Sequence, residues 1–560
     1  MLFEPSRGGD VAVCLVYPNT YAVGMANLGF QAVFEILACH PRVRCERAFL
    51  PDRDDPDRDV VSLESGRPLR DFELVAFSIS FESDYLHVVD ILEAAGIAPL
   101  REQRSSGPLL LAGGPATFLN PEPIADFFDL FLIGEGEEMI PEFLARYVAA
   151  RDAGGGRAGV LDATAEVEGA YRPDRYTIEY AADGTIQSVS YRGPGGGAVK
   201  RRLIADLDRF STASKVLAPE AVFGDMYLVE ASRGCEWGCR FCAAGYMYRP
   251  IRSRSLEQLK ETVVAGLEAR PTIGLVGAEM ASVPGIAELC EFVADRGGRP
   301  SPSSLKADVI SRRLATALGR SATKSVTVAP EAGSERMRRV INKNLTEPEI
   351  LRAADWLVGS GVQAMKLYFM IGLPTETHED VVAIVELTKK IRARFQRDGR
   401  VQRLTLSINP FGPKPWTPLQ WEPMEDLKSL KGKIDYLRRE IGRLPKVTCD
   451  VESPREAYYA TLLSRGDRRV SRLLLAIHAA DGDWWRVVQE HRRAARDGEP
   501  GMVDPDFYVR RTYAVDEILP WDFIDHSLHK RFLWVERTRA YAERQTMPCD
   551  VTTCRLCGAC

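Results

Sequence analysis

The stretch that decides the fold is "EASRGCEWGCRFCAAGYMYRPIRSRS", residues 230–255. Its three cysteines, Cys235, Cys239 and Cys242, follow the apolar run "DMYLVEAS". Thiolates this close together bind zinc or an iron–sulfur cluster, and a structural zinc normally takes four protein ligands. No fourth cysteine or histidine follows within reach in the sequence. A cubane cluster held by three cysteines leaves one iron without a protein ligand, and that iron can bind a substrate-like ligand.

Strands and helices are predicted to alternate around this stretch, from residue 219 to residue 445. The predicted strand ends are 227–235, 273–279, 301–308, 325–335, 364–377 and 404–415. Six successive strand-and-helix units predict a partial (β/α)6 TIM-like barrel, on which chemistry sits at the carboxyl ends of the strands. The three cysteines lie at the end of the first of these strands.

The first 150 residues repeat this alternation. Strands are predicted at 11–17 and 74–80 and helices at 29–40 and 85–96, and strand–loop–helix units follow at 108–117 and 130–150. The expected fold class is therefore α/β, with a flavodoxin-like parallel sheet at 1–150 whose ligands bind beyond the strand ends. In 151–218 the stretches "GGGRAG" and "GPGGGA" predict a flexible linker, interrupted by a β-hairpin at Asp183-Gly184.

The composition is that of a soluble globular protein. The chain has 560 residues, 45% of them apolar and 27% charged, which is enough for roughly three to four domains. A formal net charge of -5 gives no field that would draw in nucleic acid or an anionic membrane. No signal peptide and no run of about 18 apolar residues stands out. We expect a cytoplasmic protein that does not insert into a membrane.

The spacing Cys235-x3-Cys239-x2-Cys242, with Phe241 before the last cysteine, resembles the signature of the radical S-adenosylmethionine (SAM) enzymes. The resemblance implies that the three cysteines hold a catalytic 4Fe-4S cluster whose open iron chelates the amino and carboxylate groups of SAM. It also implies reductive cleavage of SAM to a 5'-deoxyadenosyl radical, with a small electron donor such as flavodoxin or ferredoxin as partner.

Other strand ends of the predicted barrel resemble the family's SAM contacts. "VGAE", with Gly277 and Glu279, is similar to the motif that meets the SAM amino group, although Ala278 stands where a second glycine is usual; a solvated or helix-capping acid is the alternative for Glu279. The remaining candidates are Glu331 and Ser334 for the ribose, Gly372 and Met370 for the adenine, and Lys366 and Arg336 for the SAM carboxylate or for orienting those acids. Met370 fits the core equally well, and the two cations fit an ordinary surface equally well.

The stretch "GGPATFLNPEPIADFFDLFLIGEGEEMIPEF" (113–143) resembles the N-terminal domain of cobalamin-dependent radical SAM proteins. The resemblance runs across most of residues 10–445 and implies cobalamin in the first domain and methyl transfer to an unactivated carbon. The sequence departs from the older cobalamin signature, because it contains no Asp-x-His-x-x-Gly and because His40 and His87 are outside the strand-end loops. A vestigial domain of the same fold is the alternative.

The stretch "SINPFGPKPWTPLQWEP" (407–423) and the long C-terminal region look closest to an uncharacterised branch of these proteins. Trp416 and Trp421 are candidates for the substrate mouth, with packing as the default. Residues 446–560 predict a mainly helical module, with two helices in 468–498 that carry His478 and His491 in structural or solvated positions.

The chain ends in "CDVTTCRLCGAC", and its four cysteines are called the tail cysteines from here on: Cys549, Cys554, Cys557 and Cys560. Four thiolates in so short a loop match a closed zinc site or a fully ligated second 4Fe-4S cluster.

The expected function is that of a radical SAM enzyme, a transferase that performs cobalamin-assisted methylation or a related modification. The substrate class, whether small molecule, peptide or RNA, stays open. Two alternatives remain: a methylthiotransferase-like enzyme that uses the tail cluster, and a non-catalytic iron–sulfur binding or assembly protein.

Overall fold

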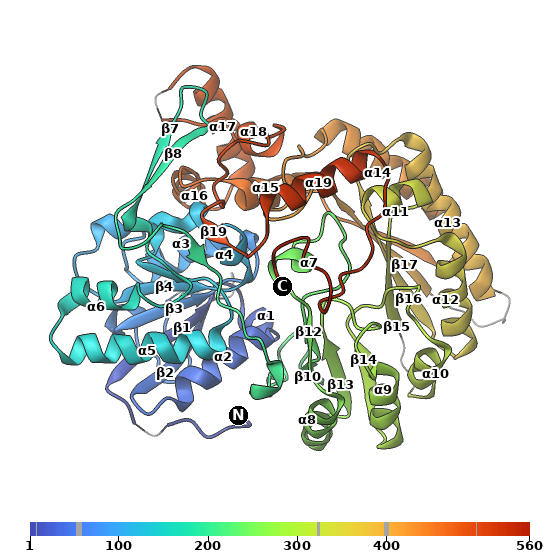
Figure 1. The fold of residues 1–560 in the computed structure, drawn as a ribbon, viewed down its shortest axis with the longest axis horizontal. Coiled ribbons are helices and arrows are strands. Elements are labelled where there is room, and N and C mark those ends of the chain that lie inside the picture. Colours follow the sequence, from blue (N-terminus) through green and yellow to red (C-terminus); the bar gives the residue numbers. More distant parts are fainter. Residues whose placement is uncertain (7, 52–58, 322–324, 397–402, 500) are drawn as a thin grey trace.

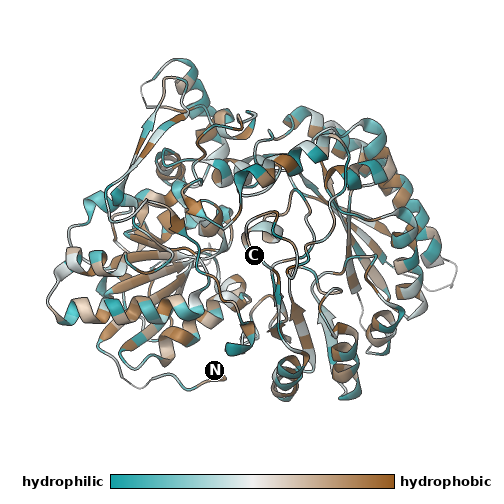
Figure 2. Cartoon of the chain, viewed as in Figure 1, coloured by the Kyte–Doolittle hydropathy of each residue, from teal (hydrophilic) through white to brown (hydrophobic). Residues whose placement is uncertain are grey.

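The computed structural model describes residues 1–6, 8–51, 59–321, 325–396, 403–499 and 501–560. Two α/β units stand side by side, and C-terminal helices lie across both of them (Figure 1). The strands of both units are apolar and the outward faces of the covering helices are polar, as the amphipathic patterns of the sequence require (Figure 2). Within the described ranges, no helix combines the length and the apolar character that crossing a membrane would take.

The first unit is a six-stranded sheet in the order β2-β1-β3-β4-β5-β6. Its strands are β1 (Val11–Tyr17), β2 (Val43–Phe49), β3 (Leu74–Ser78), β4 (Leu109–Gly113), β5 (Leu130–Leu132) and β6 (Ala170–Tyr171). The first five run parallel in the flavodoxin order 2-1-3-4-5, and β6 pairs antiparallel with β5. The expected flavodoxin-like parallel sheet is confirmed. All seven side chains of β1 are buried, which explains its unbroken apolar run.

The helices of the first unit cover both faces of this sheet (Figure 1). They are α1 (Tyr21–Gly24), α2 (Leu28–Cys39), α3 (Tyr85–Ala94), α4 (Pro115–Leu119), α5 (Gly136–Asp152) and α6 (Gly156–Thr164). The side chain of Asn27 accepts a hydrogen bond of 2.9 Å from the Phe30 amide and so begins α2. The prediction of a flexible stretch at "GGGRAG" is wrong, because helix α6 begins there. Helix α6 and strand β6 extend the first unit beyond residue 150.

The predicted hairpin is present as β7 (Tyr176–Tyr180) and β8 (Ile186–Tyr191), which pair antiparallel around Asp183-Gly184. Gly184 has φ +85°, a conformation that glycine adopts without strain. Strand β9 (Val199–Lys200) then pairs with β19 (Ile524–Asp525) of the C-terminal region. The chain between the two α/β units is thus tied to the C-terminal region.

The second unit is a partial barrel of two parallel sheets, β10-β13-β14 and β15-β16-β17-β18, joined by a parallel bridge between Leu305 and Val328. Its strands are β10 (Met226–Glu230), β13 (Thr272–Val276), β14 (Arg299–Pro302), β15 (Ser325–Glu331), β16 (Ala364–Ile371), β17 (Arg403–Pro410) and β18 (Val447–Val451). All six predicted strands are present. β18 is a seventh parallel strand that the sequence analysis did not predict, and it lies beyond residue 445.

Two short antiparallel strands, β11 (Ser232–Arg233) and β12 (Arg252–Ser253), bracket the cysteine-bearing stretch. The helices of the barrel are α7 (Ala244–Met247), α8 (Leu256–Ala269), α9 (Ile286–Asp295), α10 (Arg312–Arg320), α11 (Glu335–Val340), α12 (Glu347–Gly359), α13 (His378–Gln396) and α14 (Leu427–Gly442). Most of these helices form the outer layer of the barrel, whereas α7 follows the cysteines at its mouth (Figure 1).

The C-terminal region is mainly helical, as predicted. Its helices are α15 (Pro454–Arg465), α16 (Val470–Ala479), α17 (Trp484–Arg496), α18 (Asp506–Val509) and α19 (Lys530–Tyr541). The side chain of Asn120 in the first unit donates to the Ser464 carbonyl at 3.1 Å and to the Gly466 carbonyl at 2.7 Å. The C-terminal region is thereby fixed to the first unit, while α19 crosses the mouth of the barrel (Figure 1).

A buried ion pair joins the two α/β units. Glu135, at the carboxyl end of β5, accepts two hydrogen bonds from Arg252 of β12, at 2.7 and 2.8 Å, and Arg233 approaches it at 3.3 Å. Burial would raise the pKa of Glu135, but Arg252 and Arg233 outweigh burial and lower it. Glu135 is therefore ionised at neutral pH, and the pair holds the strand ends of the first unit against the cysteine-bearing stretch.

Replacing Arg252 with methionine leaves the buried Glu135 carboxylate with weaker partners. Removal of one partner of a buried pair costs about 3 kcal/mol or more. We expect a clearly lower melting temperature and faster limited proteolysis for Arg252→Met. Arg209→Met is the matched control, because Arg209 pairs with Glu138 at 2.7 Å but its side chain is 61% exposed; such pairs contribute about 0 to 1 kcal/mol. Equal melting temperatures for the two variants would contradict this role.

Candidate functional site

The three clustered cysteines lie together in the loop between β11 and α7, at the carboxyl end of the first barrel strand. Cys239 is buried and Cys235 and Cys242 are half-buried. Burial raises the pKa of all three thiols, that of Cys239 to about 11. The neighbouring thiols Cys239 and Cys242 raise the pKa of Cys235 further, which shows how close the three groups are. We call residues 235–242 the cluster loop.

Arg240 fixes the cluster loop from inside the protein. Its side chain has no exposed surface and forms an ion pair of 3.1 Å with Glu536 of α19. The same guanidinium donates to the carbonyls of Arg339, Val340 and Arg544 at 3.0, 2.8 and 2.7 Å. One buried cation therefore connects the loop to the segment after β15 and to the C-terminal region.

Hydrogen bonds to the backbone of the cluster loop also fix its conformation. The carbonyl of Gly238 accepts hydrogen bonds from the Asn342 side chain at 3.0 Å and from the Tyr246 hydroxyl at 3.2 Å. Gly234, directly before the first cysteine, has φ +80°, and a Cβ there would lie 2.5 Å from the Tyr248 carbonyl oxygen. Only glycine fits at this position.

Phe241 and Met370, which lie after the first and at the end of the fifth predicted barrel strand, pack against one small apolar cluster. They pack against a core that includes Ile341, Phe411 and Leu419. The structure thus brings together the aromatic residue of the cluster loop and the methionine at the end of β16. Met370 thus has the packing role that the sequence left open.

Glu331 ends strand β15 in a left-handed conformation, with φ +66°, where the register of the strand shifts. A non-glycine residue in this conformation costs of order 1 to 3 kcal/mol, and such residues concentrate at functional sites. Its carboxylate lies 3.3 Å from the ammonium of Lys343. Burial alone would lower the pKa of Lys343, but Glu331 and the Cys239 thiol outweigh burial and raise it. Lys343 is therefore a buried, charged lysine beside the cysteines.

Lys343 is a site residue that the sequence analysis missed. It follows α11 in the stretch "RRVINK", where nothing in the spacing distinguishes it from its basic neighbours. Lys366, which the sequence favoured, lies on β16 with its ammonium 5.1 Å from the ring centre of Tyr368. Arg336 pairs with Asp380 and lies 3.3 Å from Glu543, so it serves the packing of α11 against its surroundings.

Ser334 and Glu279 both stabilise local backbone. The Ser334 hydroxyl accepts from the Met337 amide at 3.0 Å, begins α11 and donates to Asp380 at 2.5 Å. Glu279 accepts hydrogen bonds from three backbone amides, those of Ala281, Ser282 and Lys306, at 2.7, 2.8 and 3.1 Å. Glu279 thus closes the loop after β13, and the helix-capping alternative is wrong, because α9 begins only at Ile286, after Gly285. Contacts of these two residues with SAM stay predictions.

Two predicted glycines lie at strand ends. Gly372 has φ +80° after β16, and a Cβ there would lie 2.8 Å from Leu430. Gly277 follows β13 and lines a cavity; a Cβ there would lie 2.7 Å from the Ser232 hydroxyl. The first glycine is required by backbone conformation and the second by close packing.

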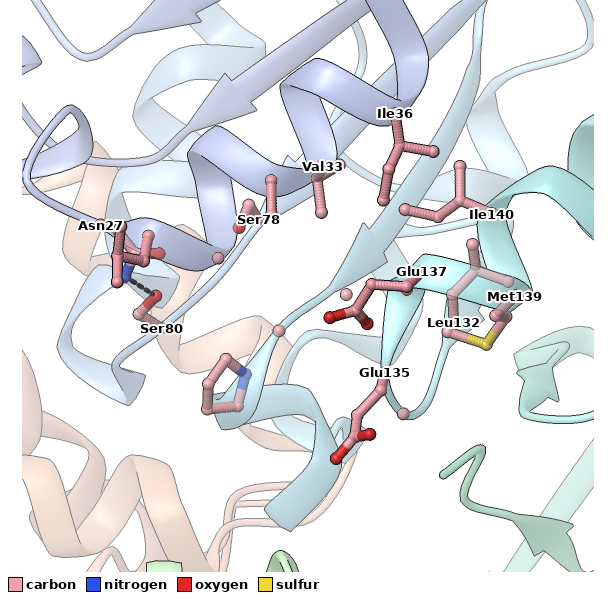
Figure 3. A pocket seen from close by; sticks show the side chains of 18 of the residues that line it. Asn27, Val33, Ile36, Ser78, Ser80, Leu132, Glu135, Glu137, Met139 and Ile140 are labelled. Atoms are coloured by element: carbon pink, nitrogen blue, oxygen red, sulfur yellow. Dashed lines mark hydrogen bonds between the residues drawn. The ribbon is translucent and has the colours of Figure 1, made fainter. Parts of the chain in front are cut away.

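A cavity of about 470 Å³ connects the two α/β units. It begins on the sheet of the first unit between α2 and α5, where Val33, Ile36, Leu132 and Ile140 form apolar walls (Figure 3). It continues past the strand ends to the cluster-loop side of the barrel, lined there by Ser232, Arg233, Gly234, Val276, Gly277 and Ala278. Strand ends of the first unit and the cluster-loop side of the barrel therefore share one cavity.

Polar groups gather at the mouth of this cavity. The Asn27 side chain donates to the Ser80 hydroxyl at 2.9 Å, and Glu135 and Glu137 project from the start of α5, directly after β5 (Figure 3). Histidine does not occur among the lining residues that the structure describes. The His87 ring contacts the Pro18 carbonyl at 2.9 Å and lies 3.7 Å from Asp84. A ligand here would meet apolar walls at depth and hydrogen-bonding groups at the opening.

The tryptophans of the proline-rich loop are packing residues. Trp421 is fully buried and meets Trp534 edge to face, with ring centres 5.2 Å apart. Trp416 is almost fully buried against His526, at 4.9 Å. The structure therefore assigns both to the default role, away from a substrate mouth. Among the other histidines, His478 lies 2.6 Å from Asp90 of α3, a structural contact between the C-terminal region and the first unit.

The tail cysteines gather beside the cluster loop. The Cys549 amide donates to the Glu236 carbonyl at 2.8 Å. Burial raises the pKa of Cys549 to about 11, Arg249 lowers it, and the other three tail thiols raise it again. Across the described residues, no three His, Cys, Asp or Glu side chains are arranged to ligate a single metal ion. The metal assignments of both cysteine sets stay predictions.

The sequence matches two families along its length. Residues 29–173 match the family described as radical SAM proteins, N-terminal, and residues 229–388 match the radical SAM superfamily. The chain is 30% identical over 466 residues to the uncharacterized protein MJ0966 of Methanocaldococcus jannaschii, a match that covers 82% of this chain and 90% of that protein.

Solved structures resemble this chain over much of its length. The cobalamin-dependent SAM radical enzyme OxsB with aqua-cobalamin and SAM bound has 12% identity and a TM-score of 0.51, over 95% of this chain and 79% of that chain. In the structure of OxsB with aqua-cobalamin alone, the match has 15% identity and a TM-score of 0.49, over 68% of this chain and about half, 52%, of that chain.

The radical SAM methyltransferase TsrM of Kitasatospora setae, with cobalamin and a [4Fe-4S] cluster bound, has 14% identity and a TM-score of 0.48, over 73% of this chain and 76% of that chain. The family matches coincide with the two α/β units, and the second contains all three cysteines of the cluster loop. The chain belongs to the radical SAM superfamily.

Proposed function

We propose that the chain cleaves SAM reductively at a 4Fe-4S cluster held by the cluster loop, and that it holds cobalamin in the cavity between its α/β units to methylate a substrate. The cavity carries the second part of this proposal, because it runs from the sheet of the first unit to the loop that bears the cysteines. When bound, the cluster and SAM supply a 5'-deoxyadenosyl radical, and cobalamin supplies methyl-transfer chemistry.

The chain's own residues support binding of both groups. The three thiols lie beside the buried ammonium of Lys343 and the carboxylate of Glu331, which suits a cluster with SAM at its open iron. Lys343 would pair with the SAM carboxylate, and Glu331 would accept hydrogen bonds from the ribose hydroxyl groups. In the cavity, apolar walls suit the aromatic base of cobalamin, and the polar mouth suits its amide side chains. The lining contains no histidine for the cobalt among the described residues, so this binding would not use a protein imidazole.

Cleavage of SAM is tested first. Anaerobically reconstituted protein with a strong reductant should form 5'-deoxyadenosine and methionine, measured by chromatography and mass spectrometry. Cys239→Ala should reduce the product to background, because a cluster needs all three thiolates. Cys290→Ala is the control, since Cys290 is buried in α9 away from the cluster loop. Absence of 5'-deoxyadenosine from the unaltered protein would favour a non-catalytic iron–sulfur protein.

Lys343 should bind the SAM carboxylate in preference to Lys366. Loss of a hydrogen bond to a charged group costs about 1.5 to 3 kcal/mol, so Lys343→Met should weaken SAM binding roughly 10-fold to 150-fold. Lys366→Met is the control and should change binding less than about 3-fold. Calorimetry on reconstituted protein, with iron content measured in each variant, decides between them. A larger loss of SAM affinity for Lys366→Met than for Lys343→Met would assign the SAM carboxylate to Lys366, the candidate from the sequence.

Cobalamin binding is tested by filling the cavity. Ala32 of α2 lines it, so Ala32→Trp should abolish retention of hydroxocobalamin on gel filtration, measured by absorbance, while 5'-deoxyadenosine formation continues. Ala94→Trp is the matched control, because Ala94 is exposed at the end of α3. Failure of the unaltered protein to retain cobalamin would leave a vestigial domain. A product heavier by a methylthio group would favour the methylthiotransferase-like alternative.

A further inference from the structure

The inner face of the barrel's second sheet carries polar side chains. Along β15, β16 and β17 every second residue is buried in the core beneath the outer helices, among them Val328, Leu367 and Leu406 (Figure 1). The residues between them are half-buried or exposed and face the inside of the barrel. A complete parallel barrel fills its interior with bulky branched side chains. In this partial barrel, charged and hydroxyl-bearing side chains take that place.

Four side chains on this face form one row across the sheet, which we call the polar row: Thr327, Lys366, Thr405 and Thr448. They lie opposite one another in register on β15, β16, β17 and β18. Neighbouring strands are about 4.8 Å apart, so Lys366 has a threonine on either side. The Thr448 hydroxyl donates to the Thr405 hydroxyl at 3.0 Å, which leaves the proton of Thr405 available to another acceptor.

The charge of Lys366 is not balanced by the residues around it. Its ammonium lies 5.1 Å from the ring centre of Tyr368, and among the described residues no carboxylate is within ion-pair distance of it. Asp450 shares the inner face but lies on β18, two strands and about 10 Å away across the sheet. Glu331 is already paired with Lys343 at 3.3 Å. Because a half-buried charge is screened less than an exposed one, an anion beside Lys366 would be held firmly.

The polar row lies deeper in the barrel than the cluster loop. Met370, at the end of β16, packs against the same apolar cluster as Phe241 of the cluster loop. Lys366 precedes Met370 by four residues on the same strand, which is about 13 Å along the backbone. Lys343 stands beside the cysteines, whereas Lys366 stands well below the strand ends. The two lysines therefore serve different ligands.

We propose that the polar row binds an anionic group of the substrate, a carboxylate or a phosphate, through Lys366 and the hydroxyls of Thr327 and Thr405. This inference rests on the proposed function, because it places a substrate in the barrel below SAM. The ammonium supplies positive charge and three donors, and the threonine hydroxyls donate to the same anionic oxygens. The substrate would then carry its anionic group at the end remote from the carbon that reacts.

Chemical protection of Lys366 tests this site. The full chain, reconstituted without added SAM, is treated with limiting acetic anhydride, and mass spectrometry measures the acetylation rate of Lys366. Sodium phosphate and sodium succinate are compared with sodium chloride at equal ionic strength. We expect phosphate or succinate to slow the reaction, by about 3-fold when the anion is at twice its Kd. Lys431, exposed on α14, is the control and should react equally in all three salts.

The pattern of protection names the anionic group. Protection by phosphate alone assigns a phosphate, protection by succinate alone assigns a carboxylate, and protection by both supports a site that takes either. Equal rates for Lys366 in all three salts, or equal protection of Lys431, would overturn the proposal. Neither SAM cleavage nor cobalamin retention is measured, so a negative result here leaves the proposed function standing.

Thr405→Val tests the hydroxyls of the polar row. This change removes one hydroxyl and keeps the branched shape, so it should weaken the affinity for the protecting anion about 10-fold, the effect of losing a hydrogen bond to a charged group. Thr262→Val is the matched control, because the Thr262 hydroxyl on the outer helix α8 donates to the Gln258 carbonyl at 2.9 Å. Circular dichroism identifies variants that fail to fold. Folded Thr405→Val protein with unchanged protection of Lys366 would contradict the role of the polar row.

Discussion

The conformation of the cluster loop depends on one buried arginine, Arg240. Arg240 lies inside the cluster loop, has no exposed surface, and satisfies carbonyls from two distant segments while its charge is paired with Glu536. A buried cation in such a network is stable only when every partner is in place. The loop that carries the three thiols therefore has its geometry set by the C-terminal region as much as by the barrel. The bond between Cys549 and Glu236 adds to the same constraint.

The carboxyl ends of the strands in the two α/β units face each other across one cavity, and ion pairs at the junction hold the units in this arrangement. Parallel sheets bind ligands at the carboxyl ends of their strands, and here the ends of both sheets face one cavity. Such an arrangement needs the edges to be held together without filling the space between them. Ion pairs of Glu135 with Arg252 and Arg233 do this at the rim, which leaves the apolar interior of the cavity open.

Local sequence was sufficient for several features that depend on neighbouring residues. The β1 strand and the hairpin at Asp183-Gly184 were predicted correctly, and the cysteine spacing pointed to the superfamily to which the chain belongs. Strand β2 was missed because Arg44, Glu46 and Arg47 interrupt its apolar pattern at the sheet edge. Lys343 was missed for a different reason. Its position beside the cysteines arises from the turn after α11 and from its burial, and neither can be recognised from the spacing of residues in the sequence.

The contact between Arg240 and the Arg544 carbonyl spans 304 positions of the chain. During synthesis at about 5 to 20 residues per second, the cluster loop would wait roughly 15 to 60 s before the segment that secures it has been made. The buried hydrogen-bond network of Arg240 can therefore be completed only late in synthesis, after the C-terminal region has been made.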